Sequence, residues 1–213
     1  MKYTVYNIII FGLISLGLTG TLLATENNDP WKSSYIYESK GEYEKAAALL
    51  TPMLDKGVYQ EYAMLRYAWL HYLQGNYNDA IRSYKKALTR NARSLDARLG
   101  LSLPLMAQGR WKEAAGYLNQ VIGMSPYHYV AHLRLMVAEE GMRQWHKLEQ
   151  HAKSMAAYYP SDATILVYLA RAYVWQDKAD AAKKVYAEIL TRFPDHIEAN
   201  HYLKNNTFTT VDE

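Results

Sequence analysis

Apolar and polar residues divide the chain into two parts. Residues 8–24 carry no charged side chain and are mostly apolar, whereas charged and apolar residues are interspersed from residue 26 onward. A segment this apolar is buried in a bilayer or handled by the export machinery. The sequence therefore predicts that residues 1–25 form a secretory signal peptide cleaved after Ala24, or an uncleaved transmembrane signal anchor. A buried core helix is the less favoured alternative.

Both favoured interpretations give the chain the same orientation. Lys2 precedes the apolar segment, and Glu26 and Asp29 follow it. Basic residues remain on the cytosolic side of a membrane segment. We therefore expect the body of the protein to be exported, either periplasmic or otherwise extracytoplasmic, or anchored in the membrane with its folded part outside the cytosol.

The body repeats itself with a period of 34 residues. Gly41, Gly75 and Gly109 each begin a similar segment that has an aromatic residue two positions later and an alanine five positions later. Pro126, Pro160 and Pro194 have the same spacing. The pattern predicts one uninterrupted domain, 27–204, followed by a disordered tail at 205–213. Its parts are repeats 27–60, 61–94, 95–128, 129–162 and 163–196 and a cap at 197–204.

The best repeat, 61–94, resembles a tetratricopeptide (TPR) unit. It has Ala68 at the eighth position, Gly75 at the turn and Ala80 at the twentieth position. The resemblance implies an all-α, right-handed α-solenoid of about five helix–turn–helix repeats and a C-terminal capping helix. Small residues at the eighth and twentieth positions let the two helices approach closely, and stacking of three or more repeats provides the core.

Repeat 129–162 departs from the pattern at three positions. Arg143 stands where the turn glycine belongs, Met136 occupies the eighth position and Leu148 the twentieth. The repeat frame nevertheless continues unbroken on both sides. We therefore expect a helix pair here as well.

Two prolines and the last helix give further expectations. Pro52 falls inside the second helix of repeat 27–60, and Pro104 falls inside the first helix of repeat 95–128. An interior proline removes a hydrogen bond, so we expect a local bend at both positions without loss of the repeat. Ile197 and Leu203 are expected to cover the end of the stack.

Composition excludes several classes of function. The 213 residues include no cysteine, which removes disulfides, thiol catalysis and thiolate metal sites. Lys and Arg total 24 and Asp and Glu total 21, so the net charge is only +3. No long basic run occurs. Nucleic acid is therefore not the expected partner.

Catalytic signals are few. The sequence has no nucleophile elbow, phosphate-binding loop or His-Glu-x-x-His motif. His128, His132 and Glu139 would be the candidate site of an unrecognised enzyme or metal-dependent protein. Two histidines do not complete a metal site, however. The favoured interpretation is a protein without catalytic residues, metal or other cofactor.

The TPR resemblance also implies a partner-binding groove, which is lined by recurrent positions of the first helices. These positions correspond here to Trp31, Tyr35, Tyr62, Leu65, Trp69, Tyr72, Leu99, Leu103, Met106, Arg171 and Trp175. Only one of these residues is basic, so a carboxylate ligand would lose hydration without gaining a partner. We therefore expect the groove to bind an apolar or aromatic segment, with Trp69 and Tyr72 as anchors.

These observations predict a non-enzymatic scaffold for protein–protein interactions in an envelope or secretory assembly. The first alternative is a self-assembling structural protein, in which a second copy occupies the groove or the end of the stack. The second alternative is the unrecognised enzyme described above. Membrane contact is expected only through the N-terminal segment, and only if that segment is not cleaved.

Overall fold

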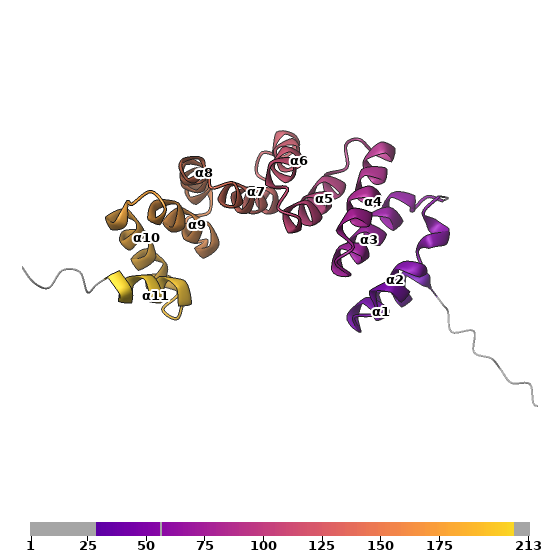
Figure 1. The fold of residues 1–213 in the computed structure, drawn as a ribbon, viewed down its shortest axis with the longest axis horizontal. Coiled ribbons are helices and arrows are strands. Elements are labelled where there is room, and N and C mark those ends of the chain that lie inside the picture. The colour runs from indigo at the N-terminus through magenta and orange to yellow at the C-terminus, as the bar shows by residue number, and fades with distance from the viewer. Residues whose placement is uncertain (1–28, 56, 207–213) are drawn as a thin grey trace, which may run out of the picture.

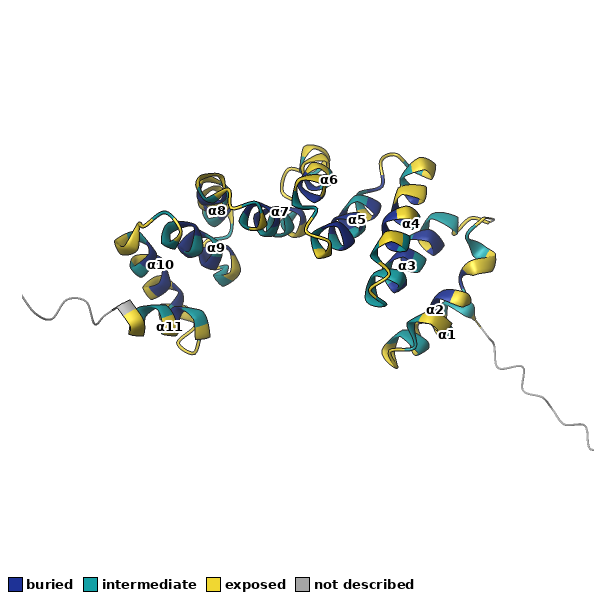
Figure 2. Cartoon of the chain, in the orientation of Figure 1, coloured by how far each residue is buried: buried dark blue, intermediate teal, exposed yellow. Residues whose placement is uncertain are grey.

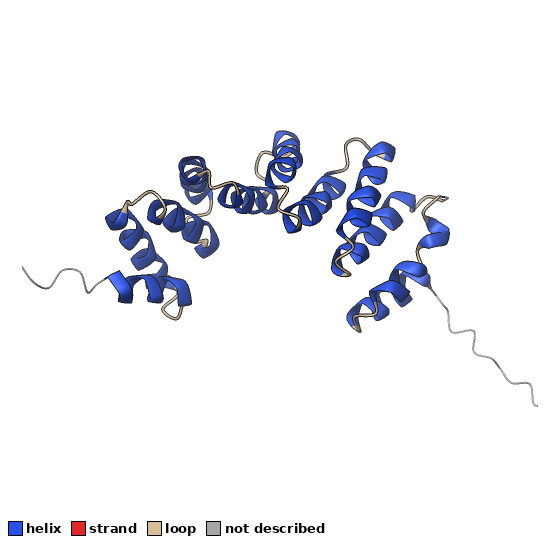
Figure 3. Cartoon of the chain, in the orientation of Figure 1, coloured by secondary structure: helices blue, strands red, loops and turns tan. Residues whose placement is uncertain are grey.

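The computed structural model describes residues 29–55 and 57–206, and every regular element within them is helical (Figure 3). Eleven α-helices and one 3₁₀ helix, η1, follow one another in these ranges. Their bounds are α1 Pro30–Ser39, α2 Tyr43–Ala48, η1 Thr51–Met53, α3 Gln60–Leu73, α4 Tyr77–Arg90, α5 Leu95–Ala107, α6 Trp111–Met124, α7 Tyr129–Gly141, α8 Trp145–Tyr158, α9 Ala163–Val174, α10 Ala179–Arg192 and α11 Ile197–Asn206.

The helices stack in pairs into an arch (Figure 1). The first helix of each pair lines the inside of the arch, and second helices such as α6 and α8 lie on the outside. The two ends of the described chain, α1 and α11, lie at the two feet of the arch. This arrangement confirms the predicted all-α solenoid of five helix pairs and a final single helix.

Close approach within the pairs depends on two buried positions in each repeat. The eighth and twentieth positions are fully buried in all five repeats, including repeat 129–162, where Met136 and Leu148 replace small residues. Burial is concentrated along the lines where helices face one another (Figure 2). The complete set is Ser34, Ala46, Ala68, Ala80, Ser102, Ala114, Met136, Leu148, Ala170 and Ala182.

The turn between the helices of each pair has a left-handed residue at the same position. The φ angle is 74° at Gly41, 78° at Gly75 and 69° at Gly109. The same conformation occurs at Arg143, with φ 55°, and at Asp177, with φ 56°. Glycine adopts it without steric cost, whereas a side chain does not. The repeat geometry is therefore kept even where the glycine is lost.

The starts of several first helices are capped at one recurrent position, the last residue of the preceding frame. Ser94 Oγ accepts from the Ala97 amide, and Asp162 Oδ1 accepts from the Thr164 amide at 2.9 Å. His128 takes the same place, with its Nδ1 3.3 Å from the Ala131 amide. Such caps satisfy amides that lack a partner within the helix.

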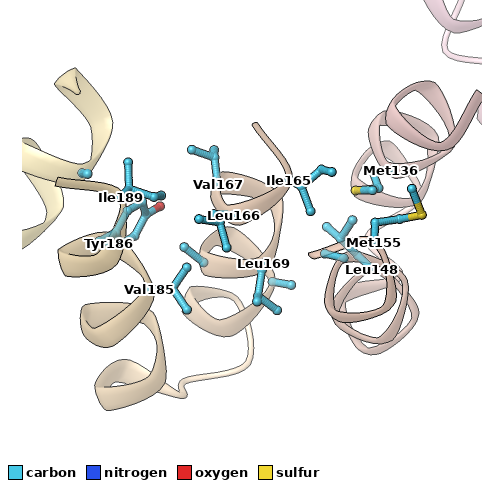
Figure 4. Close-up of a cluster of buried hydrophobic side chains, with 14 residues drawn as sticks. Met136, Leu148, Met155, Ile165, Leu166, Val167, Leu169, Val185, Tyr186 and Ile189 are labelled. Carbon is cyan, nitrogen blue, oxygen red and sulfur yellow. The ribbon is translucent and has the colours of Figure 1, made fainter. Parts of the chain in front are cut away.

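The core between the repeats consists of a row of clusters of buried apolar side chains. Its largest cluster joins α8, α9 and α10 through Leu148, Ile165, Leu169 and Ile189 (Figure 4). Trp111, the first residue of α6, packs against α7 of the next repeat. A Cβ atom on Gly141 would lie 2.5 Å from the Trp111 ring, so that glycine makes room for the tryptophan.

The prediction for Pro52 was wrong, because this helix ends instead of bending. α2 stops at Ala48, and Pro52 lies in the 3₁₀ turn η1. Proline is favoured in a first helical turn, where its missing N–H needs no partner. By contrast, α5 continues through Pro104 to Ala107. The first repeat therefore has a second helix of only six residues.

The prediction for the C-terminal cap is half right. Leu203 packs against the core, but Ile197 is 86% exposed. The face that covers the stack runs through Ala199 and Tyr202 instead, with Tyr202 packed 4.6 Å from the Tyr186 ring. α11 also extends two residues beyond the expected end.

Two predicted segments fall outside this description. The signal or anchor at 1–25 and the tail from residue 207 onward lie outside the described residues. Within 29–55 and 57–206, none of the helices combines the length and the apolar character that a membrane span requires.

Candidate binding groove

Aromatic side chains cluster on the first helices at the N-terminal foot of the arch. The Trp31 ring of α1 lies 5.0 Å from the Tyr62 ring of α3 and 6.3 Å from the Tyr59 ring. Tyr35 and Tyr62 are hydrogen-bonded through their hydroxyl groups, which raises the pKa of Tyr62. Tyr35 is 49% exposed and Tyr62 is 44% exposed. These rings offer an open apolar surface that bridges the first two repeats.

A second aromatic row continues along α3 into α4. The Trp69 and Tyr72 rings lie 5.5 Å apart, and Tyr72 lies 5.9 Å from Tyr77. Trp69 Nε1 donates to Glu38 Oε1 at 2.8 Å. Residues three or four positions apart share a helix face, so Leu65, Trp69 and Tyr72 follow one face of α3. Trp69 is half-buried and also packs in the core, so Tyr35 and Tyr62 are the more accessible rings.

The aromatic cluster is supported by a buried arginine that the sequence interpretation missed. Arg66 Nη1 lies 2.8 Å from Glu38 Oε2, and Arg66 Nε donates to Ser34 Oγ at 3.0 Å. The guanidinium also lies 3.4 Å from the centre of the Tyr35 ring. A buried cation requires such a set of partners. Arg66 thereby fixes α3 against α1 and positions Tyr35.

The middle of the predicted groove contributes less open surface. Leu99 is only 8% exposed and packs in the core, so it is poorly placed to contact a ligand. Leu65 and Met106 are half-buried against core clusters, and Leu103 is half-buried on α5. Arg134 reaches from α7 to donate to the Leu99 carbonyl at 2.6 Å, and burial lowers its pKa.

The predicted basic residue of the groove is already paired. Arg171 donates to both carboxylate oxygens of Glu198, at 2.9 and 2.7 Å, and lies 3.4 Å from Glu140. The hydrogen bonds from Arg171 to Glu198 raise the pKa of Arg171. These contacts link α7, α9 and α11. Arg171 thus holds the last two repeats and the final helix together at the C-terminal end of the concave face.

Trp175 lies apart from the other predicted groove residues. It is 63% exposed, and its ring stacks on Trp145 at 5.0 Å with an angle of 4° between the planes. Trp145 begins the second helix of the preceding repeat. The structure therefore brings together the predicted residues of the first two repeats, and it separates them from Arg171 and Trp175.

The candidate catalytic residues form a structural hydrogen-bond chain. His132 Nε2 lies 2.8 Å from the Pro126 carbonyl, His132 Nδ1 lies 2.8 Å from His151 Nε2, and His151 Nδ1 lies 2.8 Å from Glu139 Oε2. A carbonyl only accepts, so His132 donates through Nε2 and a neutral His132 accepts from His151. The hydrogen bond between His151 and Glu139 completes the chain.

This chain differs from the catalytic arrangement considered from the sequence. His151, which was not foreseen, connects His132 to the buried Glu139, while His128 serves as a helix cap. Burial lowers the pKa of His132, which favours its neutral form. In the part of the chain that the structure describes, no group of three or more histidine, aspartate or glutamate side chains is arranged to hold a metal ion. The hydrogen bonds of His151 therefore connect α8 to α7.

Comparisons with known proteins find tetratricopeptide repeats in the sequence. Two models of the tetratricopeptide repeat match the sequence, one over residues 65–129 and the other over 165–196. Both matches avoid most of the divergent repeats 27–60 and 129–162. No curated protein matches the sequence.

Solved structures share the fold at low sequence identity. A tetratricopeptide repeat protein from Parabacteroides merdae is 13% identical with a TM-score of 0.74, over 83% of this chain and 70% of its own. MamA from Desulfovibrio magneticus is 17% identical with a TM-score of 0.70, over 79% of this chain and 98% of its own. YrrB, described as a TPR protein with an unusual peptide-binding site, is 18% identical with a TM-score of 0.68. The match covers 85% of this chain and 96% of YrrB. The chain therefore contains tetratricopeptide repeats and has the fold of a TPR solenoid.

Proposed function

We propose that the protein is a non-enzymatic scaffold whose concave face binds an apolar or aromatic segment of a protein partner. The TPR fold favours a protein–protein interaction role. The observation that carries the proposal is the aromatic surface of α1 and α3, on which Trp31, Tyr35 and Tyr62 lie together and partly exposed. Tyrosine and tryptophan provide large contact areas with few rotatable bonds, which suits them as binding anchors.

The charges on the concave face support the same ligand chemistry. Arg66 is paired with Glu38 under the aromatic cluster, and Arg171 is paired with Glu198 and Glu140. A charged ligand group would have to displace one of these partners. An extended peptide or one face of an amphipathic helix, with its aromatic or aliphatic side chains on the α1–α3 surface, requires no such exchange.

The test is selection from a displayed peptide library on the immobilised full chain. We expect enrichment of peptides with aromatic or large aliphatic residues. Tyr62→Ala should weaken binding of the selected peptides by about 2 kcal/mol, a typical loss for an anchor residue. Tyr158→Ala is the matched control, because Tyr158 is also an exposed tyrosine paired with a second one, Tyr127, but lies on α8.

Two results would contradict the proposal. One is a library that yields no binders. The other is a set of binders that lose equal affinity in Tyr62→Ala and Tyr158→Ala, after circular dichroism has shown intact helices in both variants. In either case the binding surface lies elsewhere on the arch.

We further propose that the scaffold acts outside the cytosol, in an envelope or secretory assembly. The support is the uncharged apolar segment at 8–24, which lies outside the described residues. Mass spectrometry of the N-terminal peptide tests this proposal. A mature protein that begins near Thr25 indicates cleavage, an intact membrane-embedded N-terminus indicates an anchor, and an intact N-terminus in the soluble cytosolic fraction contradicts export.

A further inference from the structure

A polar cleft lies between the first two repeats, where apolar packing is expected. The cleft has a volume of about 450 Å³ between α2 and α3. Its lining residues are Glu44, Ala47, Ala48, Thr51, Tyr67, His71, Gln74 and Asn76. A second hollow shares Glu44, Gln74 and Asn76 with it and extends along α2 toward Gly41. The site is therefore elongated.

The next pair of repeats shows what normally fills this place. One repeat later, the residues equivalent to Ala47, Tyr67 and His71 are Ile81, Leu101 and Leu105, which are buried in one apolar cluster. Gln74 and Glu44 correspond to Gln108 and Asn78, which are joined by a hydrogen bond of 2.8 Å. The same junction is thus closed and apolar between the second and third repeats, and open and polar between the first and second.

Three of the five buried side-chain atoms that lack a hydrogen-bond partner in the described structure lie in this cleft, and the other two belong to Glu38 and Arg66. Nδ1 and Nε2 of His71 and Nε2 of Gln74 are buried, and no hydrogen-bond partner lies near them in the described structure. Gln74 Oε1 is already engaged by Asn76 Nδ2 at 2.8 Å. Each unsatisfied buried group is costly, and native proteins contain few of them. Burial and the charge of Arg82 lower the pKa of His71, so the imidazole is neutral, with one donor and one acceptor nitrogen.

The cleft is distinct from the proposed groove. Successive residues of an α-helix are about 100° apart, so positions 67, 71 and 74 point away from positions 65, 69 and 72. The two sites therefore use opposite faces of α3. A ligand in the cleft would leave the aromatic surface free.

We propose that this cleft binds an extended peptide segment that carries a basic side chain. Successive main-chain amide groups of an extended peptide offer a carbonyl acceptor for Gln74 Nε2, and an acceptor and a donor for the two nitrogens of His71. Glu44 lines both hollows and is exposed, and among the described residues no cation forms an ion pair with it. A lysine or arginine of the ligand supplies that partner. The carboxylate favours such a peptide over a neutral saccharide.

The experiment uses the ¹⁵N-labelled full chain and three probes. The first is an acetylated, amidated tripeptide with a central lysine between glycines, the second has norleucine in place of lysine, and the third is N,N′-diacetylchitobiose. We expect the lysine peptide to shift the NMR signals of the His71 ring and the Gln74 side-chain amide. Replacement of lysine by norleucine, or Glu44→Gln in the protein, should weaken binding about threefold, because Glu44 is exposed and an exposed ion pair contributes little.

Filling the cleft tests the site itself. Ala47→Ile combined with His71→Leu copies the closed junction and should abolish binding of the lysine peptide. Gln74→Leu is the smaller change for use if the double variant does not fold, and it should also abolish binding. Gln108→Leu, at the closed junction, should bind like the wild type.

Three results would overturn the proposal. They are no shift at millimolar lysine peptide, an unchanged affinity in the filled variant or in Gln74→Leu, and binding of the saccharide in preference to the peptide. The first result would mean that water alone satisfies His71 and Gln74. None of these outcomes depends on whether the concave groove binds a partner.

Discussion

The two halves of the arch have the same helix-pair geometry but different side chains on their inner faces. In repeats 27–60 and 61–94 the inner face presents Tyr35, Tyr62 and Trp69 over a buried arginine. In the last two repeats the same face presents Arg171 held between two carboxylates. Both halves share the left-handed turn residue and the burial of the eighth and twentieth positions. Residues that fix the helix pairs are therefore separate from residues that determine what the surface can bind.

The largest difference between the halves should be in the effect of removing an arginine. Arg66→Met leaves Glu38 without its cation beneath the aromatic cluster, and loss of one partner of a buried pair destabilises a protein by on the order of 3 kcal/mol. Arg171 is partly exposed, so Arg171→Met should cost at most about 1 kcal/mol. Urea denaturation of the two variants measures the difference.

A second substitution controls this prediction. Glu38→Gln keeps an acceptor for Trp69 but removes the charge, and it should restore part of the stability lost in Arg66→Met. Equal losses in the two arginine variants, or no recovery in the double variant, would show that the pairs at the two ends are equivalent.

The dependence of peptide affinity on ionic strength shows which half of the concave face the ligand contacts. Because the aromatic surface has its charges already paired, peptides selected on the groove should bind with little change between low and high ionic strength. Exposed ion pairs weaken as salt rises. A strong loss of affinity with salt would mean that the ligand contacts the charged C-terminal half of the concave face.

Acidification should lower the folding stability of both halves, because each half contains one histidine with a lowered pKa. The pKa values of His71 and His132 are lowered, in both cases chiefly by burial. As pH falls through about 6.5, the unfolded chain binds protons on these residues before the folded protein does, so acidification favours unfolding. Stability should be greatest above pH 6.5 and should decrease toward pH 5.5.

Single replacements identify the contribution of each histidine. His71→Leu and His132→Gln should each make the urea midpoint less dependent on pH between 7.5 and 5.5. A midpoint that rises on acidification would contradict the direction of both pKa shifts.

The smallest expected effect concerns the turns. Arg143 has the left-handed backbone that Gly75 has in the first half. Arg143→Gly should therefore stabilise the protein by about 1 kcal/mol, because it removes the steric cost of a side chain there. Gly75→Ala should destabilise by a similar amount. Thermal denaturation of the two variants gives the comparison, and a destabilised Arg143→Gly would mean that the Arg143 side chain has a role of its own.

The repeat spacing predicted most of the fold, because positions such as Ala68, Ala80 and Gly75 have the same packing task in every repeat. It could not predict that the second helix of the first repeat ends before Pro52. The repeat frame predicts where a second helix should lie, but it does not show whether the last turns of that helix can bury enough apolar surface to form. Ile197 was misplaced for a related reason, since the rotation of a terminal helix depends on neighbours from one side only.

Prediction of the site was less complete. The aromatic positions of α1 and α3 follow directly from the repeat frame. Arg66 and His151 were missed because their partners lie on other helices, 28 to 32 residues away for Arg66 and 12 to 19 for His151. The polar junction could have been found by aligning the repeats, since His71 stands where the next repeat has Leu105.

The six-residue length of α2 has a consequence for the order in which the solenoid loses structure. In a stack of repeats, stability is the sum of each unit's own contribution and its coupling to its neighbours. The first repeat contributes little stability of its own, so it stays folded mainly through the contacts of α1 and α2 with α3. It should therefore detach first and take Trp31 and Tyr35 with it. A ligand that bridges α1 and α3 binds only the docked form, so occupancy of the aromatic surface and folding of the first repeat are a single linked equilibrium.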